Sequence, residues 1–341
     1  MLRVTPLKAI SFVSLSAALL SSCSLSQYAA KVNGQVITQG QLVSELKDVA
    51  SNKPFVAQIE KSQGSIYGSG AGTFSSAFTA EILNRRISVT LIQQALKKLH
   101  LPVSQSALAV AYPEAAAGFG GATVFAGFPK NYQAQLVNDT AAIDTLEAHL
   151  VGKSLSPTAV NNYYNQHVGA FTEYCSSDIL VTTQSAAASI AKQVAAGSSF
   201  ASLAQKDSKD TNTASNGGAL GCGLLSQYSQ AFGPSFAQEV SSLGVNQVSS
   251  PFQGSQGWYL IEVTSKPVVP ETQAVPNIVT QLLGSAAPTK LADYVQSFAK
   301  ASQVEVNPSY GRLSLANGQV SVLPPSAPSA AAQKAFFATP S

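Results

Sequence analysis

Apolar and polar residues alternate over two stretches in the second half of the chain, and between them apolar residues recur at helical spacing. Residues 177–181 (Ser-Asp-Ile-Leu-Val) and 257–263 (Gly-Trp-Tyr-Leu-Ile-Glu-Val) each predict a strand. Residues 186–195 carry apolar side chains along one helical face. The run 216–221 (Asn-Gly-Gly-Ala-Leu-Gly) lies between this helix and the second strand and predicts a tight turn. This order predicts a small sheet with helices packed over it, about the size of one domain.

The chain before this segment is mainly helical in its periodicity. A hairpin is predicted around Asn33-Gly34, because this dipeptide favours a two-residue turn, and Thr38 is a predicted N-cap. The glycine-rich stretch 64–72 predicts a loop that lacks the Lys-Ser/Thr ending of a phosphate-binding loop, and 118–128 predicts a second loop. Helices are predicted at 41–50, at 75–101, from 104 onward, at 130–151 and at 158–167.

The chain after residue 263 is less regular. Residues 266–276 contain prolines and predict a linker, and 277–302 predict one or two helices interrupted at Pro288. Short strands are predicted at 304–308 and 319–323. The Pro-, Ala- and Ser-rich residues 324–341 predict a disordered tail.

Length and charge narrow the class of protein. A chain of 341 residues leaves room for two domains. The formal net charge is +3, and Arg3 and Lys8 precede Cys23 while no acid does, so the remainder carries about +1. Without basic runs, this balance argues against nucleic acid as a partner. Charged residues make up only 11% of the chain, which predicts a neutral, polar surface.

The first 22 residues have the form of a secretion signal. Arg3 and Lys8 precede an apolar run, 9–20, that is too short for a membrane span. Residues 20–23 (Leu-Ser-Ser-Cys) resemble a bacterial lipobox, in which Cys23 would carry the lipid and 23–29 would form a tether. The alternative is a simple secretory signal cut near its last serine. Two or more acyl chains on Cys23 would hold the protein stably on a membrane.

Five motifs in order make the segment from 174 to 263 resemble the parvulin (PpiC-like) family of peptidyl-prolyl cis-trans isomerases. The chain before it, from the hairpin and first helix onward, resembles the chaperone domain of SurA-type and PrsA-type foldases. The motifs are the family's opening strand at 177–181, its helix at 197–204, its acidic run at 207–210, its Gly-Gly-Asp-Leu-Gly turn at 217–221 and its Gly-Tyr-His-Ile-Ile strand at 257–261.

This resemblance implies an α+β fold. A mainly helical, SurA-like chaperone domain would consist of residues 30–170 and 267–323, because the chain returns to complete the first domain in SurA-type proteins. A parvulin-like domain of a small antiparallel sheet with helices, 171–266, would be inserted between the two parts.

The resemblance also implies a site. Leu220, Phe232 and Phe236 stand where parvulins place the proline pocket, Asp210 stands where the family has Cys or Asp beside the twisting bond, and Gln256 lies near a polar position before the last strand. The alternative for the two phenylalanines is core packing without a substrate role. The alternative for the aspartate is an ordinary loop acid.

Asp178 and Tyr259 occupy the places of the family's two facing histidines, which is the main departure from the family. The chain's histidines, His100, His149 and His167, all lie outside the segment. A carboxylate opposite a phenol can share a hydrogen bond as two imidazoles do. The alternatives are a solvent-facing aspartate on a strand and a tyrosine that only packs.

Cys175 and Cys222 are the cysteines left besides Cys23. In an exported protein two such cysteines usually pair, and closing this loop stabilises the fold by about 4 kcal/mol at most. A metal site is not expected from two cysteines with no histidine nearby.

These features favour an exported, lipid-anchored foldase on the extracytoplasmic face of a bacterial membrane or in the periplasm. It would isomerise X-Pro bonds in unfolded, proline-containing exported proteins and bind them as a chaperone. The rotation breaks no covalent bond, so no cofactor is expected. The first alternative is a catalytically weak or inactive parvulin-like module that only binds extended peptides, as the missing histidines and Ala219 suggest. The second is a structural envelope lipoprotein.

Overall fold

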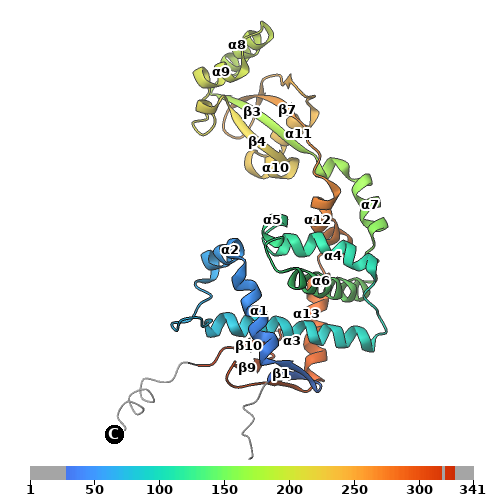
Figure 1. Cartoon of the computed structure of the whole chain (residues 1–341). Coiled ribbons are helices and arrows are strands. Elements are labelled where there is room, and N and C mark those ends of the chain that lie inside the picture. Colours follow the sequence, from blue (N-terminus) through green and yellow to red (C-terminus); the bar gives the residue numbers. More distant parts are fainter. Residues whose placement is uncertain (1–27, 317–318, 327–341) are drawn as a thin grey trace, which may run out of the picture.

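The computed structural model describes residues 28–316 and 319–326 (Figure 1). The predicted signal peptide (1–22), the lipid-bearing Cys23, most of the tether and residues 327–341 of the tail lie outside the described residues. The described part has a helical body and a smaller unit built on a sheet, and α7 (Pro157–Gln166) and α12 (Glu271–Leu283) lie between them (Figure 1). The protein therefore has the mixed α+β fold that the sequence predicts.

One hydrophobic core holds the helical body together. Its longest helix, α3, begins after Ser75, whose hydroxyl accepts a hydrogen bond from the Phe78 amide, and buries most of its apolar residues. Thr38 caps α1 as predicted, in a capping box with Gln41. The helices of this body are α1 (Gln39–Ser51), α2 (Lys53–Gln63), α3 (Ser76–Lys98), α4 (Gln105–Gly118), α5 (Ala122–Phe125), α6 (Lys130–Val151) and α13 (Ala287–Lys300).

A three-stranded sheet joins the two ends of the described chain. The predicted hairpin forms around Asn33-Gly34, both at positive φ, and pairs β1 with β2. On its other edge β1 pairs antiparallel with β8, and α13 packs against α3 and α6. The chain after the second unit thus returns to the N-terminal helices. The strands of this sheet are β1 (Tyr28–Val32), β2 (Gln35–Thr38) and β8 (Val304–Val306). Strands β9 (Arg312–Ser314) and β10 (Ser321–Leu323) pair antiparallel in a separate sheet.

The second unit is an antiparallel sheet between two hydrophobic layers. Its order is β4-β3-β7-β5, with β6 also paired to β7. The strands are β3 (Glu173–Val181), β4 (Ala219–Leu224), β5 (Gln247–Val248), β6 (Phe252–Gln253) and β7 (Trp258–Ser265). One layer packs under α8 (Gln184–Ala195) and α9 (Phe200–Asp207), and the other under α10 (Leu225–Phe232) and α11 (Pro234–Ser242). Two 3₁₀ turns, η1 (Val168–Phe171) and η2 (Ala214–Asn216), complete the unit.

A third apolar cluster lies where α7 (Pro157–Gln166) contacts α4 and α12 (Glu271–Leu283). The linker prediction for 266–276 was partly wrong here, because α12 begins at Glu271 and contains Pro276. A proline inside a helix loses one backbone hydrogen bond, but the apolar face of α12 is buried and compensates. Pro288 does separate the two helices, since it lies in the first turn of α13.

The other local predictions were wrong in a few places. Helix α2 and strands β4, β5, β6 and β9 were missed, and α5 occupies part of the predicted loop 118–128. Strand β4 begins inside the predicted turn 216–221. The predicted tether ends early, because β1 already begins at Tyr28. Each of these elements is short and gains its stability from tertiary packing rather than from local periodicity.

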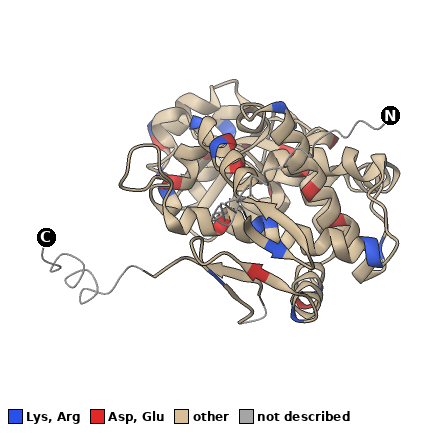
Figure 2. Cartoon of the chain, turned by 60° about the horizontal axis from the view of Figure 1, so that its bottom comes forward, with Lys and Arg blue, Asp and Glu red and all other residues tan. Residues whose placement is uncertain are grey.

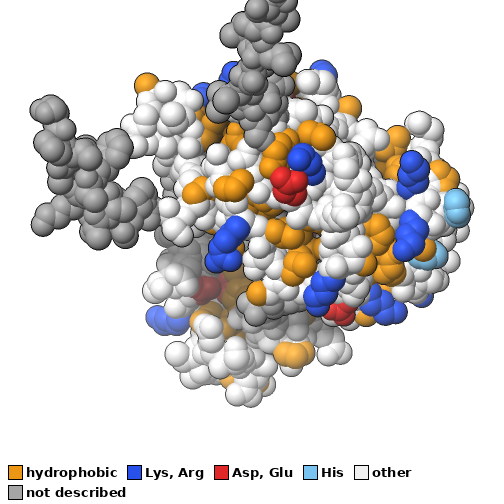
Figure 3. Space-filling model, turned by 90° about the horizontal axis from the view of Figure 1, so that it is seen from below, with side chains coloured by type: hydrophobic (Ala, Val, Ile, Leu, Met, Phe, Trp, Pro, Cys, Tyr) orange, Lys and Arg blue, Asp and Glu red, His pale blue; other side chains and the backbone are white. Residues whose placement is uncertain are grey.

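The surface carries few charges, as the composition predicts. Basic and acidic residues are scattered along the helices and strands rather than gathered by sign (Figure 2). On the face seen from below, hydrophobic side chains lie between separate lysines and arginines (Figure 3). Among the described residues, we find no helix of the length and apolarity that crossing a membrane requires.

Candidate active site in the sheet unit

The pairing of β3 with β7 brings Asp178 and Tyr259 to one face of the sheet. Tyr259 lies opposite Leu180, and Asp178, two residues before Leu180, lies opposite Ile261. Residues two apart on a strand point to the same side, so Asp178 and Tyr259 are diagonal neighbours facing α10 and α11. The sheet register therefore places these two predicted residues together.

Asp178 is completely buried. Its Oδ1 accepts a hydrogen bond of 2.9 Å from the Thr213 hydroxyl, and its amide donates to the Gly218 carbonyl at 2.8 Å. Burial raises the pKa of Asp178 to about 6. The hydrogen bond from Thr213 lowers this pKa, and the nearby charge of Asp210 raises it. The alternative of a solvent-facing aspartate is therefore wrong.

The hydrogen bond expected between Asp178 and Tyr259 does not form. Asp178 Oδ2 and Tyr259 Oη are both buried and have no hydrogen-bond partner among the described residues. Burial raises the pKa of the Tyr259 phenol, and the charges of Asp178 and Asp210 raise it further. The carboxylate turns to Thr213 instead, because a hydroxyl lies within reach there. The phenol packs edge-on against Phe236, with the ring centroids 5.4 Å apart.

Leu220, Phe232 and Phe236 lie in one apolar cluster beneath α10 and α11. The rings of Phe232 and Phe236 stack with centroids 4.5 Å apart. Only 1% of Phe236 is exposed, so it forms the floor of the cluster. Phe232 and Leu220 are partly exposed, so these two side chains are the ones that a bound peptide can reach.

Asp210 is partly exposed and is held in a tight turn. Its Oδ1 accepts from the Asn212 amide at 2.9 Å, and its carbonyl accepts from the Ala214 amide at 2.9 Å. Its charge acts on both Asp178 and Tyr259, which places it beside the cluster. Gln256 is exposed in the turn between β6 and β7. The structure therefore brings Asp210 to the buried residues and leaves Gln256 outside them.

Sequence reasoning missed three residues of this site. Phe252 stacks on Tyr259, with the centroids 5.8 Å apart, and contacts Phe236. A Cβ on Gly254 would lie 2.7 Å from the Tyr259 ring, so a glycine there leaves space for the phenol. Thr213 lies in a loop, where no periodicity marks a buried position. Only its place three residues after the predicted Asp210 pointed to it.

Cys175 and Cys222 lie opposite each other on β3 and β4 and are joined by a disulfide bond. The bond ties the edge strand to the central strand at the end of β3 remote from Val181. Within the described ranges, no group of three or more His, Cys, Asp or Glu side chains could hold a metal ion.

The site thus offers an apolar aromatic surface beside a partly exposed carboxylate, over a buried carboxyl and a buried phenol. The aromatic rings suit an apolar ring such as that of proline, and Asp210 is placed to accept a hydrogen bond from a peptide N–H. This arrangement favours binding and orienting a peptide.

The sequence of the sheet unit is similar to that of known isomerase domains. Residues 172–265 match the family model described as Rotamase, the PPIC-type PPIASE domain. The chain is 33% identical over 146 residues to a parvulin-like PPIase of Rickettsia felis, a match that covers 41% of this chain and 51% of that protein. It therefore spans about half the length of this curated relative.

Two foldases match over more of the chain. The foldase protein PrsA of Clostridium kluyveri is 24% identical over 301 residues, covering 81% of this chain and 86% of that protein. The crystal structure of the peptidylprolyl isomerase PrsA from Bacillus anthracis aligns with a TM-score of 0.29 and 23% identity, covering 64% of this chain and 96% of that chain. On the sheet unit, motif, register and family model agree, and residues 172–265 belong to the parvulin (PpiC-type) family of peptidyl-prolyl cis-trans isomerase domains.

Proposed function

We propose that this protein is an exported foldase that isomerises X-Pro bonds in unfolded polypeptides. The observation that carries the proposal is the joining of Leu220, Phe232 and Phe236 into one cluster beside Asp210, on a domain of the parvulin family. The whole chain, from the helical body through the sheet unit and back, would act as one foldase. Residues 30–170 and 267–323 would form its chaperone domain and 171–266 its isomerase domain.

The reaction requires only that the twisted amide is bound better than the planar one. The barrier of about 18–20 kcal/mol arises from amide resonance. In the twisted form the nitrogen is more basic and the carbonyl less polarised, so a site that holds the proline ring and a hydrogen-bonding group near the amide lowers the barrier. Phe232 and Leu220 would grip the ring, and Asp210 would face the peptide beside the rotating bond.

The test is a prolyl-peptide isomerisation assay on the whole chain, with Phe232→Ala and Phe74→Ala as matched variants. Both phenylalanines are partly buried, but Phe74 packs in the helical body. We expect kcat/KM to fall roughly tenfold or more in Phe232→Ala only, since an aromatic contact and its apolar area are lost. A wild-type rate equal to the uncatalysed rate would remove the enzyme hypothesis.

The proposal extends to the location of the protein. A lipid on Cys23 would anchor the foldase to the extracytoplasmic face of the cell membrane, where unfolded exported chains emerge. Mass spectrometry of the mature N-terminus tests this. An acylated Cys23 is expected, and an unmodified N-terminus after cleavage near Ser22 would contradict the anchor.

A second candidate function is peptide binding without turnover where α4, α7 and α12 meet, which a cavity of about 720 Å³ favours. Pro113 in α4 and Pro276 in α12 cannot donate to the carbonyls of Ala109 and Thr272, four residues earlier. Both of these residues line the cavity, and in the proposed binding mode their carbonyls would accept hydrogen bonds from the N–H groups of an extended peptide. The lining residues include Ala109, Tyr112, Pro113, Val160, Thr272 and Pro276.

Filling this cavity separates the second function from the first. Ala117 lines the cavity and is exposed, and Ala134 is an exposed alanine on α6. We expect Ala117→Phe to weaken suppression of aggregation of an unfolded client, and Ala134→Phe to leave it unchanged. Equal suppression by both variants would exclude this cavity as the peptide site.

A further inference from the structure

The loop that carries Asp210 is closed against β3 by a ring of buried hydrogen bonds through Thr213. The Thr213 hydroxyl donates to Asp178 Oδ1 at 2.9 Å, and only 7% of Thr213 is exposed. Its carbonyl accepts from the Gly218 amide at 2.9 Å, and the Gly218 carbonyl accepts from the Asp178 amide at 2.8 Å. A Cβ on Gly218 would lie 2.2 Å from the Asp178 carbonyl oxygen, so only a glycine lets the loop lie this close to the strand.

This ring fixes the position of Asp210. The carbonyl of Asp210 accepts from the amides of Thr213 at 3.3 Å and Ala214 at 2.9 Å. Just before it, the Lys209 amide donates to the Leu180 carbonyl at 2.7 Å. Asp210 is therefore held on both sides, by β3 before it and by Thr213 after it. If Thr213 were released, the downstream half of this support would be lost.

Thr213 is also the side chain that makes a buried Asp178 tolerable. Among the described residues, no cation forms an ion pair with Asp178, and Thr213 is its one side-chain hydrogen-bond donor. A hydrogen bond to a charged group is stronger than one between neutral groups, and an unpaired buried carboxylate is costly. The site thus depends on a hydroxyl at this position.

The other titratable groups around Asp178 do not replace this bond. The charge of Asp210 raises the pKa of Asp178, and the charge of Asp178 in turn raises the pKa of the Tyr259 phenol. From the helices packed on this face, α10 contributes Tyr228, whose hydroxyl is bonded to the Tyr174 carbonyl at 2.7 Å, and α11 contributes Glu239, which is partly exposed.

We propose that Thr213 is a positioning residue of the isomerase site, whose hydroxyl holds Asp178 and thereby sets the Asp210 loop beside the aromatic cluster. This inference rests on the proposed isomerase function. Thr213 does not touch the substrate, because it is buried behind the loop. Thr213 influences turnover because it fixes the position of Asp210.

The experiment compares Thr213→Val, Thr213→Ser and Thr211→Val in the whole chain. Valine keeps the shape of threonine and removes the donor, serine restores the donor, and Thr211 is an exposed threonine of the same loop. We expect kcat/KM for a prolyl peptide to fall roughly tenfold in Thr213→Val, mainly through kcat, because a small displacement of an orienting group has effects of this size. Thr213→Ser should recover most of the loss, and Thr211→Val should match the wild type.

A second readout does not depend on activity. The Thr213 hydroxyl favours the charged form of Asp178, so Thr213→Val should raise the titration midpoint of the Asp178 carboxyl by about one pH unit, followed by carbon-13 NMR. Thr213→Ser should return the midpoint to the wild-type value. An unchanged midpoint in Thr213→Val would overturn the inference whatever the activity.

The outcomes separate this inference from the proposed function. If the wild-type chain does not accelerate isomerisation, the proposed function fails, and the positioning role fails with it even if the midpoint moves. If the wild type is active and Thr213→Val equals it in kcat/KM, only the positioning role is refuted. If Thr213→Val does not fold, Thr213→Ala and Thr213→Ser are compared in the same way, and equal rates and midpoints in these two variants refute it.

Discussion

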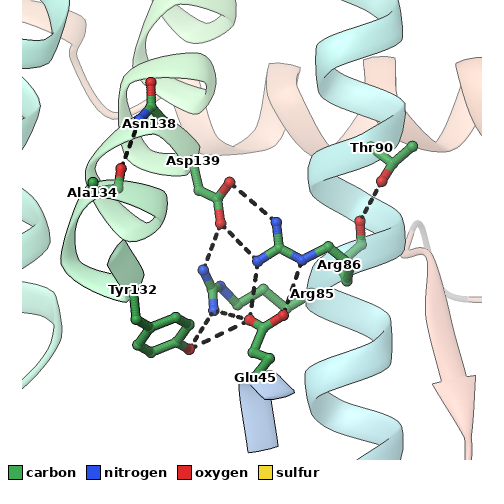
Figure 4. Close-up of polar contacts among 8 residues, drawn as sticks. All are labelled: Glu45, Arg85, Arg86, Thr90, Tyr132, Ala134, Asn138 and Asp139. Carbon is green, nitrogen blue, oxygen red and sulfur yellow. Dashed lines mark hydrogen bonds and ion pairs between the residues drawn. The ribbon is translucent and has the colours of Figure 1, made fainter. Parts of the chain in front are cut away.

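The buried ion cluster between α1, α3 and α6 gives the sharpest stability prediction. The Glu45 carboxylate accepts from Arg85 at 2.7 Å and from Arg86 at 3.0 Å, and Asp139 accepts from the same two arginines at 2.7 and 3.0 Å (Figure 4). The Arg85 guanidinium also donates to the Tyr132 hydroxyl at 3.1 Å. The four charges cancel, and they tie three helices together inside the helical body.

Glu45→Gln removes one negative charge and leaves two guanidinium groups facing one carboxylate. The carboxylate side chains of Glu45 and Asp139 are 5% and 6% exposed, and the side chains of Arg85 and Arg86 are 24% and 17% exposed. Removing one partner of a buried pair costs about 3–5 kcal/mol, and water that reaches the arginines favours the lower end. Burial alone would lower the pKa of Arg86, but Glu45 and Asp139 outweigh burial and raise it. Glu45→Gln removes one of these two carboxylates, and the guanidinium stays charged because arginine is not deprotonated in proteins.

Urea and thermal unfolding, followed by circular dichroism at neutral pH, measure this loss. A cost of about 3 kcal/mol corresponds to a fall in Tm of about 6–12 °C for a domain of this size. The control is Glu305→Gln, which breaks the Lys31–Glu305 pair at 3.1 Å, where the two side chains are 37% and 55% exposed. This pair is open to solvent and should contribute little to stability. A loss below about 1 kcal/mol in Glu45→Gln, or equal losses in both variants, would refute the reasoning.

Three further outcomes follow from the sheet unit. Asp178 has a pKa of about 6 in the folded state against a usual 3.8, so its contribution to stability is present below about pH 4 and lost as the pH rises through 6. Relative to the wild type, the free energy of unfolding of Asp178→Asn in urea should therefore rise by about 3 kcal/mol between pH 4 and 7. A difference that does not change with pH would contradict this. Gly254→Ala should lower both Tm and kcat/KM, since its Cβ would lie 2.7 Å from the Tyr259 ring. The control, Gly221→Ala, has open space around its Cβ and should lower only Tm, through backbone strain at its positive φ. Equal effects of the two variants on kcat/KM would argue against a role for the position of the phenol. Reducing the Cys175–Cys222 bond should lower the free energy of unfolding by roughly 4 kcal/mol, because the bond closes a loop with a sequence separation of 47. Calorimetric scans with and without reductant measure this loss, and scans that agree would exclude a stabilising role.

Local pattern was sufficient for the elements whose hydrophobic period is long and regular. Strands β3 and β7 alternate, α3 and α6 carry an apolar face, and Asn33-Gly34 specifies its own turn. These features depend on residues that are neighbours in the sequence, so the local sequence is enough to predict them. Helix α12 shows the limit of this reasoning. Its internal Pro276 argues against a helix locally, and burial against α4 and α7 overrides that preference.

The candidate site divides in the same way. The resemblance to parvulins was enough to group Leu220, Phe232, Phe236 and Asp210 as one predicted site. The sequence did not show which of them is buried, nor that Gln256 is exposed. Both depend on the packed fold, including the pairing of β6 with β7.

By itself the sequence determined the order of the elements, the aromatic cluster and the loss of both family histidines. Only the tertiary structure decided that Asp178 bonds to Thr213 rather than to Tyr259. The physical reason is that a buried carboxylate takes the nearest donor, and nearness between residues far apart in the chain is set by strand register and loop closure. Strand register and loop closure are properties of the packed fold, which no local pattern encodes.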